Sequence, residues 1–384
     1  MTEQLTHQKS PKQLRIGCAV FFFISGFGYS SWASRIPTIQ SQLHLNEAQL
    51  GAVLFALPIG LMFTLPITGR LLSAYSSRYI LLFGALFLNI VLTLIGITVN
   101  IWQLAITLFC LGSARNLLNI SINAQAVGVQ TLYKKSIMAT FHGIWSLAGF
   151  AGAALGYIMV YYNVVPVYHF LAVSILLLLF SVYYFPFTYH DKPIPQTSKK
   201  IFSFPDKSLL RFAFICFASM ACENTMYDWS GIYFEKVIHV DRATATFGFV
   251  IYIAAMTLGR FIGDKMINRY GVKLLLKLSG IFIFGGMLLA ALLPYMATAT
   301  LGFALVGLGV SCIVPMVFQI AGKSSTMSSG TALASISTIG YIGFLLVPPV
   351  VGFVAQAVNL RLSFGIIAML GALVIIMVKG MDNK

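Results

Sequence analysis

The chain has 384 residues, of which 58% are hydrophobic and only 9% are charged. A soluble domain needs about 25% charged residues to cover its surface, so this composition excludes a soluble globular protein and indicates an integral membrane protein. A net charge of +15 would suit a nucleic-acid partner, but the positions of the basic residues favour another explanation.

Apolar runs of about the 20 residues that cross a bilayer recur along the chain. They predict an all-α integral membrane protein with twelve transmembrane helices. The first run lacks a small-residue cleavage site and is expected to remain as a helix. In chain order, the predicted spans are residues 14–35, 49–72, 79–99, 101–127, 137–160, 167–187, 209–234, 244–266, 272–294, 296–320, 329–357 and 361–380.

The basic residues follow the topology of these spans. Of the 25 Lys and Arg residues, twenty fall at one end of the spans, four (Arg35, Lys236, Arg242 and Arg361) fall at the other, and Arg115 lies within a span. The positive-inside rule predicts that both termini are cytoplasmic, and the even number of spans agrees. Topology therefore explains the positive charge, and no nucleic-acid partner is expected.

The chain divides into two similar halves. We predict an N-terminal six-helix bundle (1–189), a polar cytoplasmic linker (190–208) and a C-terminal six-helix bundle (209–384). Residues of the halves match at offsets of 195 to 197: Trp32 with Trp229, Tyr75 with Tyr270, Arg78 with Lys273, Gly84 with Gly280, and Gly156 with Gly352. A duplicated bundle of this kind holds its substrate between the halves near the bilayer midplane.

Arg115 lies near the middle of the fourth span. A guanidinium at that depth is costly unless it faces a cavity or a partner. At about 100° per residue, Arg115 shares an arc of roughly 100° with three amides, which can donate and accept hydrogen bonds. These amides, Asn116, Asn119 and Asn123, suit either sugar hydroxyls or interhelical hydrogen bonds.

The seventh span supplies charges of the opposite sign. Glu223 lies near its middle, and Asp228 lies five residues further toward the outside, which is about 7 Å along a helix. Asn224 shares a helix face with Asp228, whereas Glu223 is turned away by about 100°. Either carboxylate could carry a coupling proton and meet Arg115. The alternative is a static ion pair that only locks helices together.

Aromatic and basic residues near the ends of spans complete the candidates. Tyr29, Trp32, Trp229 and Tyr341 could stack on a sugar ring or close a gate, although the two tryptophans could instead anchor the membrane interface. Arg35 is expected at the outer mouth, either as a gate or bound to lipid headgroups. His142 lies near the inner end of the fifth span. We expect it to pack or to form a hydrogen bond there, and a role as a proton relay is the alternative.

The loop after the eighth span carries a recognisable motif. It reads G-R-F-I-G-D-K-M-I-N-R-Y-G-V-K over residues 259–273. This resembles the major facilitator signature G-x-x-x-D-R-x-G-x-[RK], with Asn268 at the acidic position and the first glycine displaced by one residue. The resemblance implies gating roles for Gly259, Arg260, Arg269 and Gly271. In the first half, Ser73 stands at the acidic position, so both halves lack the acid that braces this loop in the family.

A finer resemblance covers nearly the whole chain. The segments that carry it are residues 31–37, the helix with Asn119 and Asn123, residues 142–147, 223–229 and 340–344, and Pro348-Pro349. They resemble the bacterial YbjJ-like subgroup, a distant relative of fucose-permease-like sugar transporters. The resemblance implies two pseudo-symmetric six-helix bundles, a cavity lined by spans 1, 4, 7 and 10, a monomer, and the bacterial inner membrane.

No catalytic arrangement is evident in the sequence. It has no G-x-x-x-x-G-K-[ST] loop, and its five cysteines lack metal-ligand spacing. We therefore expect no enzyme, no metal and no cofactor. The favoured function is alternating-access, proton-coupled symport of a small polar solute, a sugar or a sugar-like metabolite, with protons and membrane lipid as further partners.

Two other functions remain open from the sequence. The first is proton-driven efflux of drugs or metabolites, although the fifth span lacks the glycine-proline motif usual in drug exporters. The second is a non-transporting sensor or lipid-handling protein.

Overall fold

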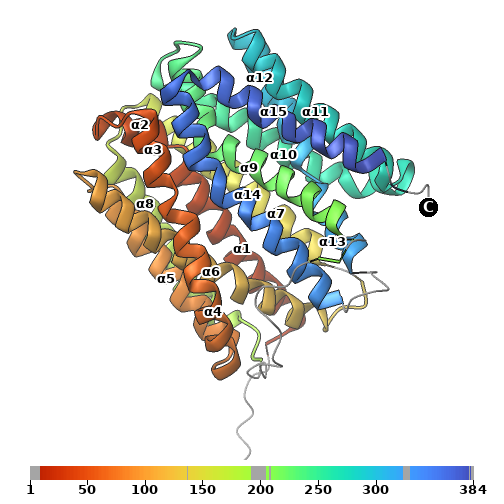
Figure 1. The fold of residues 1–384 in the computed structure, drawn as a ribbon. Helices are drawn as coiled ribbons and strands as arrows, with labels where there is room; N and C mark the ends of the chain where they lie inside the picture. Colours follow the sequence, from red (N-terminus) through yellow and green to blue (C-terminus); the bar gives the residue numbers. More distant parts are fainter. Residues whose placement is uncertain are drawn as a thin grey trace, which may run out of the picture.

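The computed structural model is an all-helical bundle (Figure 1) and describes residues 9–135, 137–191, 205–206, 209–322, 329–379 and 381. Most of the linker at 190–208 therefore lies outside the described residues. The helices are α1 (Pro11–Ala33), α2 (Ile36–Gln42), α3 (Glu47–Leu54), α4 (Ala56–Ala74), α5 (Ser77–Ile95), α6 (Ile101–Gln130), α7 (Met138–Tyr161), α8 (Pro166–Tyr184), η1 (Phe185–Phe187), α9 (Leu210–Lys236), α10 (Arg242–Tyr270), α11 (Val272–Leu292), α12 (Met296–Val310), α13 (Ile313–Ala321), α14 (Ser329–Ala357) and α15 (Leu360–Lys379).

The predicted all-α membrane fold is confirmed. Within the described ranges, eleven helical segments are long and apolar enough to cross a membrane. The remaining predicted span is α9, which has 27 residues. Its acidic residues Glu223 and Asp228, and charged residues at both of its ends, make it more polar than the others. The least apolar span is thus the one expected to hold functional carboxylates.

Local sequence signals set several helix ends. Ser10 caps α1 because its hydroxyl accepts a hydrogen bond from the Gln13 amide, while the Gln13 side chain accepts one from the Ser10 amide. Asp241 caps α10 by accepting hydrogen bonds from the amides of Ala243 and Thr244. Gly271 ends α10 with a φ of 79°, a conformation that favours glycine.

Two predicted spans are broken rather than continuous. The second span divides into α3 and α4 at Phe55, and the tenth divides into α12 and α13 at Ser311 and Cys312. A proline follows each break within one helical turn, Pro58 in α4 and Pro315 in α13, and cannot donate a hydrogen bond to the carbonyl four residues earlier. The second break has a structural consequence, because the carbonyl of Ser311 accepts a hydrogen bond from the Arg260 side chain at 3.4 Å.

Each half packs mainly on itself, and the halves meet along two seams. In the first half α1 packs on α7 and α8, and in the second half α9 packs on α14, α10 and α15. The seams between the halves are α7 with α10 and α3 with α14. At the second seam Gly51 and Gly352 come so close that a Cβ on Gly51 would lie 2.9 Å from the Cα of Gly352.

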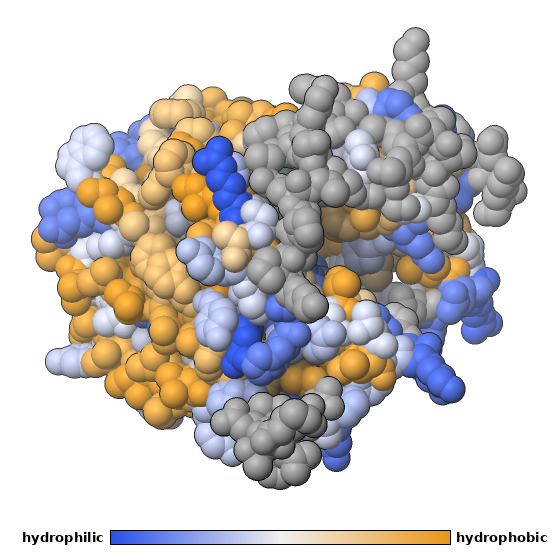
Figure 2. All heavy atoms as spheres, turned by 90° about the horizontal axis from the view of Figure 1, so that it is seen from below, coloured by the Kyte–Doolittle hydropathy of each residue, from blue (hydrophilic) through white to orange (hydrophobic). Residues whose placement is uncertain are grey.

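The two ends of the bundle differ. We call the end where α1 begins and α15 ends the terminal end, and the end where α1 ends and α15 begins the opposite end. At the opposite end, Lys236 pairs with Glu47, and Arg242 donates a hydrogen bond to Ser41, so both contacts join the halves. Figure 2 views the bundle from below, toward the terminal end, where hydrophilic side chains interrupt apolar ones.

Candidate functional site

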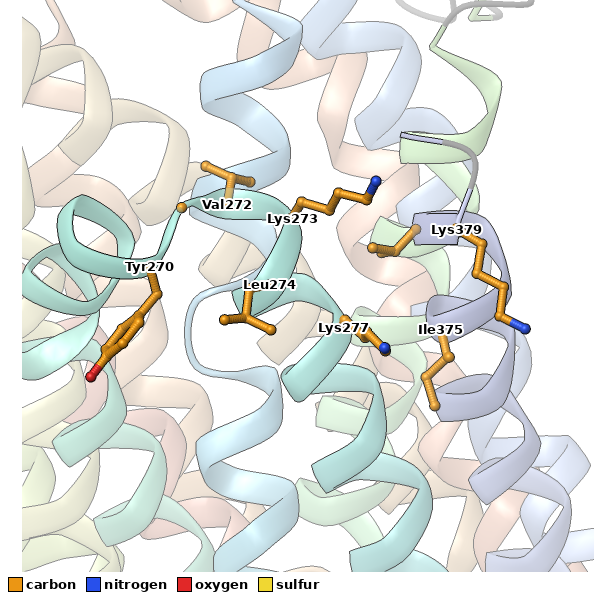
Figure 3. A pocket seen from close by; sticks show the side chains of 9 residues that line it. Tyr270, Val272, Lys273, Leu274, Lys277, Ile375 and Lys379 are labelled. Carbon is orange, nitrogen blue, oxygen red and sulfur yellow. The ribbon is translucent and has the colours of Figure 1, made fainter. Parts of the chain in front are cut away.

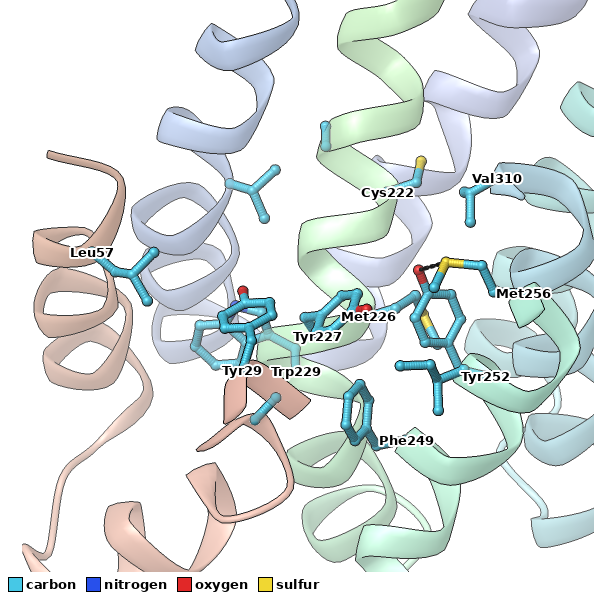
Figure 4. Packing of buried hydrophobic residues seen from close by; sticks show 14 of the residues in the cluster. Tyr29, Leu57, Cys222, Met226, Tyr227, Trp229, Phe249, Tyr252, Met256 and Val310 are labelled. Carbon is cyan, nitrogen blue, oxygen red and sulfur yellow. Dashed lines mark hydrogen bonds between the residues drawn. The ribbon is translucent and has the colours of Figure 1, made fainter. Parts of the chain in front are cut away.

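Two stacked tyrosines bring the halves together at the centre of the bundle. Tyr29 of α1 and Tyr227 of α9 have ring centroids 5.0 Å apart and an interplanar angle of 25°. Tyr227 also contacts Phe249 and Tyr252 of α10 edge-on, with centroids at 5.2 and 5.9 Å. Figure 4 shows this aromatic layer between α1, α9 and α10. Tyr29 is thus at the boundary between the halves, as expected of a residue that lines a central site.

Arg115 of α6 lies on this layer. It is only 8% exposed, and its guanidinium carbon is 3.3 Å from the centroid of the Tyr29 ring. A cation over an aromatic face is favourable, but the ring satisfies no N–H donor. Among the described residues, neither Nε nor Nη1 of Arg115 has a hydrogen-bond partner. Because unpaired buried donors are costly, this guanidinium has capacity for a ligand.

The three asparagines of α6 differ in their surroundings. Asn116 accepts a hydrogen bond from Thr68 at 2.6 Å, which ties it to α4. Asn119 accepts one from Ser25 of α1 at 2.7 Å. Asn123 is exposed and donates to the backbone carbonyl of Asn119. Interhelical hydrogen bonding therefore describes Asn116 and Asn119, whereas the side-chain oxygen of Asn123 accepts no hydrogen bond among the described residues.

The polar residues of α9 separate into two groups. Asn224 donates to Asp228 at 3.0 Å, and both residues are buried. Glu223 faces elsewhere, as the helical spacing predicts, and forms an ion pair with Arg260 of α10 at 3.7 Å. Arg115 lies within electrostatic range of both carboxylates. No contact ion pair joins it to either one within the described chain, so the static ion pair given as the alternative is not formed in this conformation.

Arg260 is the centre of a network that the sequence did not predict. Besides Glu223, it donates to the hydroxyl of Ser146 on α7 at 2.7 Å and lies 5.3 Å from the Trp145 ring. Trp145 in turn donates to Ser25, the partner of Asn119. The sequence indicated Arg260 only through the family motif. The signal that could have revealed its partners is the H-G-I-W-S segment of the fifth span.

The two candidate tryptophans are inside the protein. Trp32 is 1% exposed and Trp229 is fully buried, so the alternative that they anchor the membrane interface is wrong for this conformation. The indole N–H of each has no hydrogen-bond partner among the described residues. Both lie closer to the opposite end than the Tyr29–Tyr227 stack does. Tyr341 is partly buried on α14.

Arg35 does not occupy an open outer mouth. It is 1% exposed and donates to Nδ1 of His169 at 3.0 Å and to the carbonyl of Val164 at 2.8 Å. Arg35 is therefore not a headgroup anchor in this conformation, because its guanidinium is used within the first half, and a gating role stays a prediction. The hydrogen bond to His169 was invisible in the sequence, since His169 is more than a hundred residues away.

The motif residues lie along the half of α10 that leads to the terminal end, from Gly259 to Gly271. Gly259 lets Ser311 approach, since a Cβ there would lie 2.4 Å from the Ser311 hydroxyl. Arg269 rests on the Tyr270 ring at 5.3 Å, and Gly271 makes the turn into α11. In the first half, Asp191 lies at the start of α5, where its carboxylate accepts from the backbone amide of Ser77 at 3.1 and 3.2 Å.

Accessibility around the centre is asymmetric. Toward the terminal end, Asn123 and His142 are exposed, and Glu223 retains 22% of its side-chain exposure. The ring of His142 also lies 5.4 Å from Phe22. Toward the opposite end, Trp32, Trp229 and neighbouring side chains are buried.

Known proteins resemble this chain along nearly its full length. An uncharacterized MFS-type transporter of Yersinia pestis is 30% identical over 356 residues, covering 93% of this chain and 92% of that protein. Membrane protein MosC of Rhizobium meliloti is 29% identical over 373 residues, covering 96% and 90%.

Solved structures share the fold. The nucleoside transporter NupG, as a mutant, superposes with a TM-score of 0.76 at 15% identity, covering 96% of this chain and 100% of that one. A bacterial homolog of the human lysosomal transporter Spinster gives 0.73 at 12% identity, covering 97% of each. The pattern of the Major Facilitator Superfamily matches residues 18–342. The chain therefore belongs to the Major Facilitator Superfamily of membrane transporters.

Proposed function

We propose that this protein is a proton-coupled symporter that imports a small polar solute, a sugar or a sugar-like metabolite, by alternating access. The observation that carries the proposal is the buried Arg115 guanidinium with two unpaired donors over the Tyr29 ring. A polar solute with oxygen acceptors would satisfy these donors, and its ring would meet the aromatic layer. A purely lipophilic drug would leave them unsatisfied, which disfavours efflux of such compounds.

Proton coupling is assigned to Glu223, with Asp228 as the second carboxylate. Glu223 pairs with Arg260, and Arg260 also donates to Ser146 across the α7–α10 seam. Protonation of Glu223 would remove one of the charges that hold Arg260 in place. The protonation state would then be linked to the contact between the halves.

The moving units in this proposal are the bundles 1–189 and 209–384, joined by the linker 190–208. The contacts at the opposite end, Lys236 with Glu47 and Arg242 with Ser41, support a conformation that is closed there. Exposure of Asn123 and His142 supports an opening toward the terminal end. The Spinster homolog, which shares the fold, was solved in an inward-facing and occupied conformation, and we propose an inward-facing state for this chain.

The proposed orientation places the terminal end in the cytoplasm of a bacterial cell, in the inner membrane. It rests on the twenty basic residues at that end against four at the other. A cysteine replacing His190 should react with a membrane-impermeant reagent only from the inside, whereas one replacing Asn163 should react in intact cells. The five native cysteines are first replaced by serine. External labelling of the His190 position would reverse the orientation.

The transport proposal is tested in two steps. A thermal-shift screen of the purified protein over sugars, amino sugars, nucleosides and organic acids identifies solutes that stabilise it. Proteoliposomes then measure uptake of each hit with an imposed proton gradient and without one. Accumulation that requires the gradient supports symport. Expulsion of the hit by an inward proton gradient would instead establish efflux, and absence of any movement would favour a sensor or lipid-handling protein.

A further inference from the structure

A pocket separate from the central site lies at the terminal end, between α11 and α15. Its volume is about 630 Å³. The end of α10, the turn at Gly271, the first turns of α11 and the last turns of α15 surround it (Figure 3). The side of the pocket toward the bundle centre is closed where α11 and α15 touch. There, a Cβ on Gly280 would lie 2.9 Å from the carbonyl oxygen of Gly371.

The charged side chains that line the pocket in the described part of the chain are all basic. They are Lys273, Lys277 and Lys379. Figure 3 shows Lys273 and Lys277 extending from α11 toward α15, and Lys379 extending from the end of α15. In the part of the chain that the structure describes, none of the three forms an ion pair with a carboxylate. Because Lys273 and Lys277 are four residues apart on one helix face, they repel each other unless an anion lies between them.

The remaining walls are apolar and lead toward the lipid. Val272, Leu274, Ile375 and Val378 share the lining with the lysines. Leu274 is 44% exposed, and further along the same two helices Ile281 and Ile376 are exposed at 42% and 59%. Exposed apolar residues on membrane-spanning helices face the acyl chains. The pocket therefore joins a cationic rim to a lipid-facing apolar surface.

We propose that this pocket binds an anionic phospholipid, with its phosphate held by Lys273, Lys277 and Lys379 and its acyl chains lying along α11 and α15. Basic pockets between transmembrane helices suit anionic headgroups, and each lysine near such a surface contributes about fivefold in affinity. A free phosphate would use the lysines but leave the apolar walls without a partner. The site is independent of the transported solute, because none of its residues belongs to the central site.

The test compares two triple variants by native mass spectrometry of the purified protein with added phosphatidylglycerol. The first carries K273Q, K277Q and K379Q. The control carries K12Q, K134Q and K135Q, which removes the same charge from exposed residues at the same end. Five of the six lysines are exposed and Lys273 is partly buried, and none forms an ion pair with a carboxylate in the described chain, so both variants should keep the wild-type unfolding temperature in lipid-free detergent. We expect the first variant to lose at least about tenfold in phosphatidylglycerol affinity, and the control to keep it.

Two further arms separate the lipid from other anions. Phosphatidylcholine should not replace phosphatidylglycerol, because its headgroup has no net charge. Inorganic phosphate and glycerol phosphate at millimolar concentration should not displace the lipid, because they cannot use the apolar walls. Equal losses in both triple variants would overturn the proposal in favour of unspecific charge attraction. Displacement by inorganic phosphate would overturn it in favour of a free-anion site.

Discussion

Arg115 and Arg260 both lie within membrane-spanning helices, and their surroundings differ. Arg260 contacts Glu223, the hydroxyl of Ser146 and the carbonyl of Ser311. Arg115 lies over the Tyr29 ring and leaves Nε and Nη1 without a partner. The comparison suggests a division of roles, because donors that are already satisfied hold helices in position, whereas unsatisfied donors are available to a solute.

The two carboxylates of α9 also differ in the groups that hold them. Asp228 is held by an amide of its own helix, whereas Glu223 is held by a guanidinium from α10 that also reaches across to α7. Neutralising Glu223 therefore changes a contact between the halves, whereas neutralising Asp228 changes only its immediate surroundings.

The largest expected effect separates accumulation from exchange. Glu223→Gln should abolish gradient-driven uptake in proteoliposomes yet retain counterflow of solute. Glutamine keeps the shape of a protonated glutamate but cannot release a proton, and counterflow needs only the loaded carrier to reorient. The matched control is Glu235→Gln, which removes a carboxylate from the opposite end of the same helix and should keep uphill uptake. Normal accumulation by Glu223→Gln would exclude this residue as the coupling site.

A smaller effect is expected at the seam between the halves. Ser146→Ala removes a hydrogen bond from a charged donor at 2.7 Å, which is worth about 2 kcal/mol. It should lower the population of the present conformation by about 30-fold relative to its alternatives. The measurement is the labelling rate of a cysteine that replaces the exposed Asn123, and this rate should fall.

The control for this experiment is Ser174→Ala. Ser174 also donates a buried hydrogen bond, to the carbonyl of Asn89 at 2.8 Å, but within the first half. It should lower the unfolding temperature without changing the labelling rate. If both variants changed the rate equally, the contact between Arg260 and Ser146 would have no special part in the conformational equilibrium.

The smallest effect is expected at the opposite end. Lys236→Gln removes the ion pair with Glu47, in which the lysine side chain is 39% exposed. Exposed pairs contribute about 0.2–1 kcal/mol, so the labelling rate at position 123 should fall no more than about fivefold. Salt at 0.5 M should remove the difference from wild type, because screening weakens the pair in the parent protein. A difference that persists in high salt would assign Lys236 a contact other than this ion pair.

The sequence was sufficient for the fold because lipid permits few solutions. Each stretch of backbone that crosses hydrocarbon must satisfy its own hydrogen bonds, so apolar length predicts helices well. The helix breaks at Phe55 and Ser311 were not predicted because apolar length alone does not show them, although Pro58 and Pro315 follow them within one helical turn and cannot donate to the carbonyl four residues earlier. At the second break, Gly259 and Arg260 of α10 approach Ser311.

The site was predictable only in part. Helix periodicity indicated that Arg115 and the asparagines share a face, and that Glu223 points away from Asp228. It could not assign partners between helices, because these depend on how distant segments pack. Tyr29 was a candidate for stacking on a sugar, and the structure adds that its ring lies under Arg115. The pairing of Glu223 with Arg260 and the burial of Arg35 against His169 are of the same kind.

The central claim is that the open donors of Arg115 hold the solute rather than a carboxylate of α9. The most direct measurement is binding of the screened solute to wild type, Arg115→Ala, and Arg115→Ala combined in turn with Glu223→Gln and with Asp228→Asn. Loss of two hydrogen bonds from a charged donor, about 1.5–3 kcal/mol each, should weaken binding by at least about 100-fold, whereas Arg70→Ala at an exposed site should not. We expect neither double variant to recover binding, and recovery in either one would show that Arg115 serves only to balance the charge of that carboxylate.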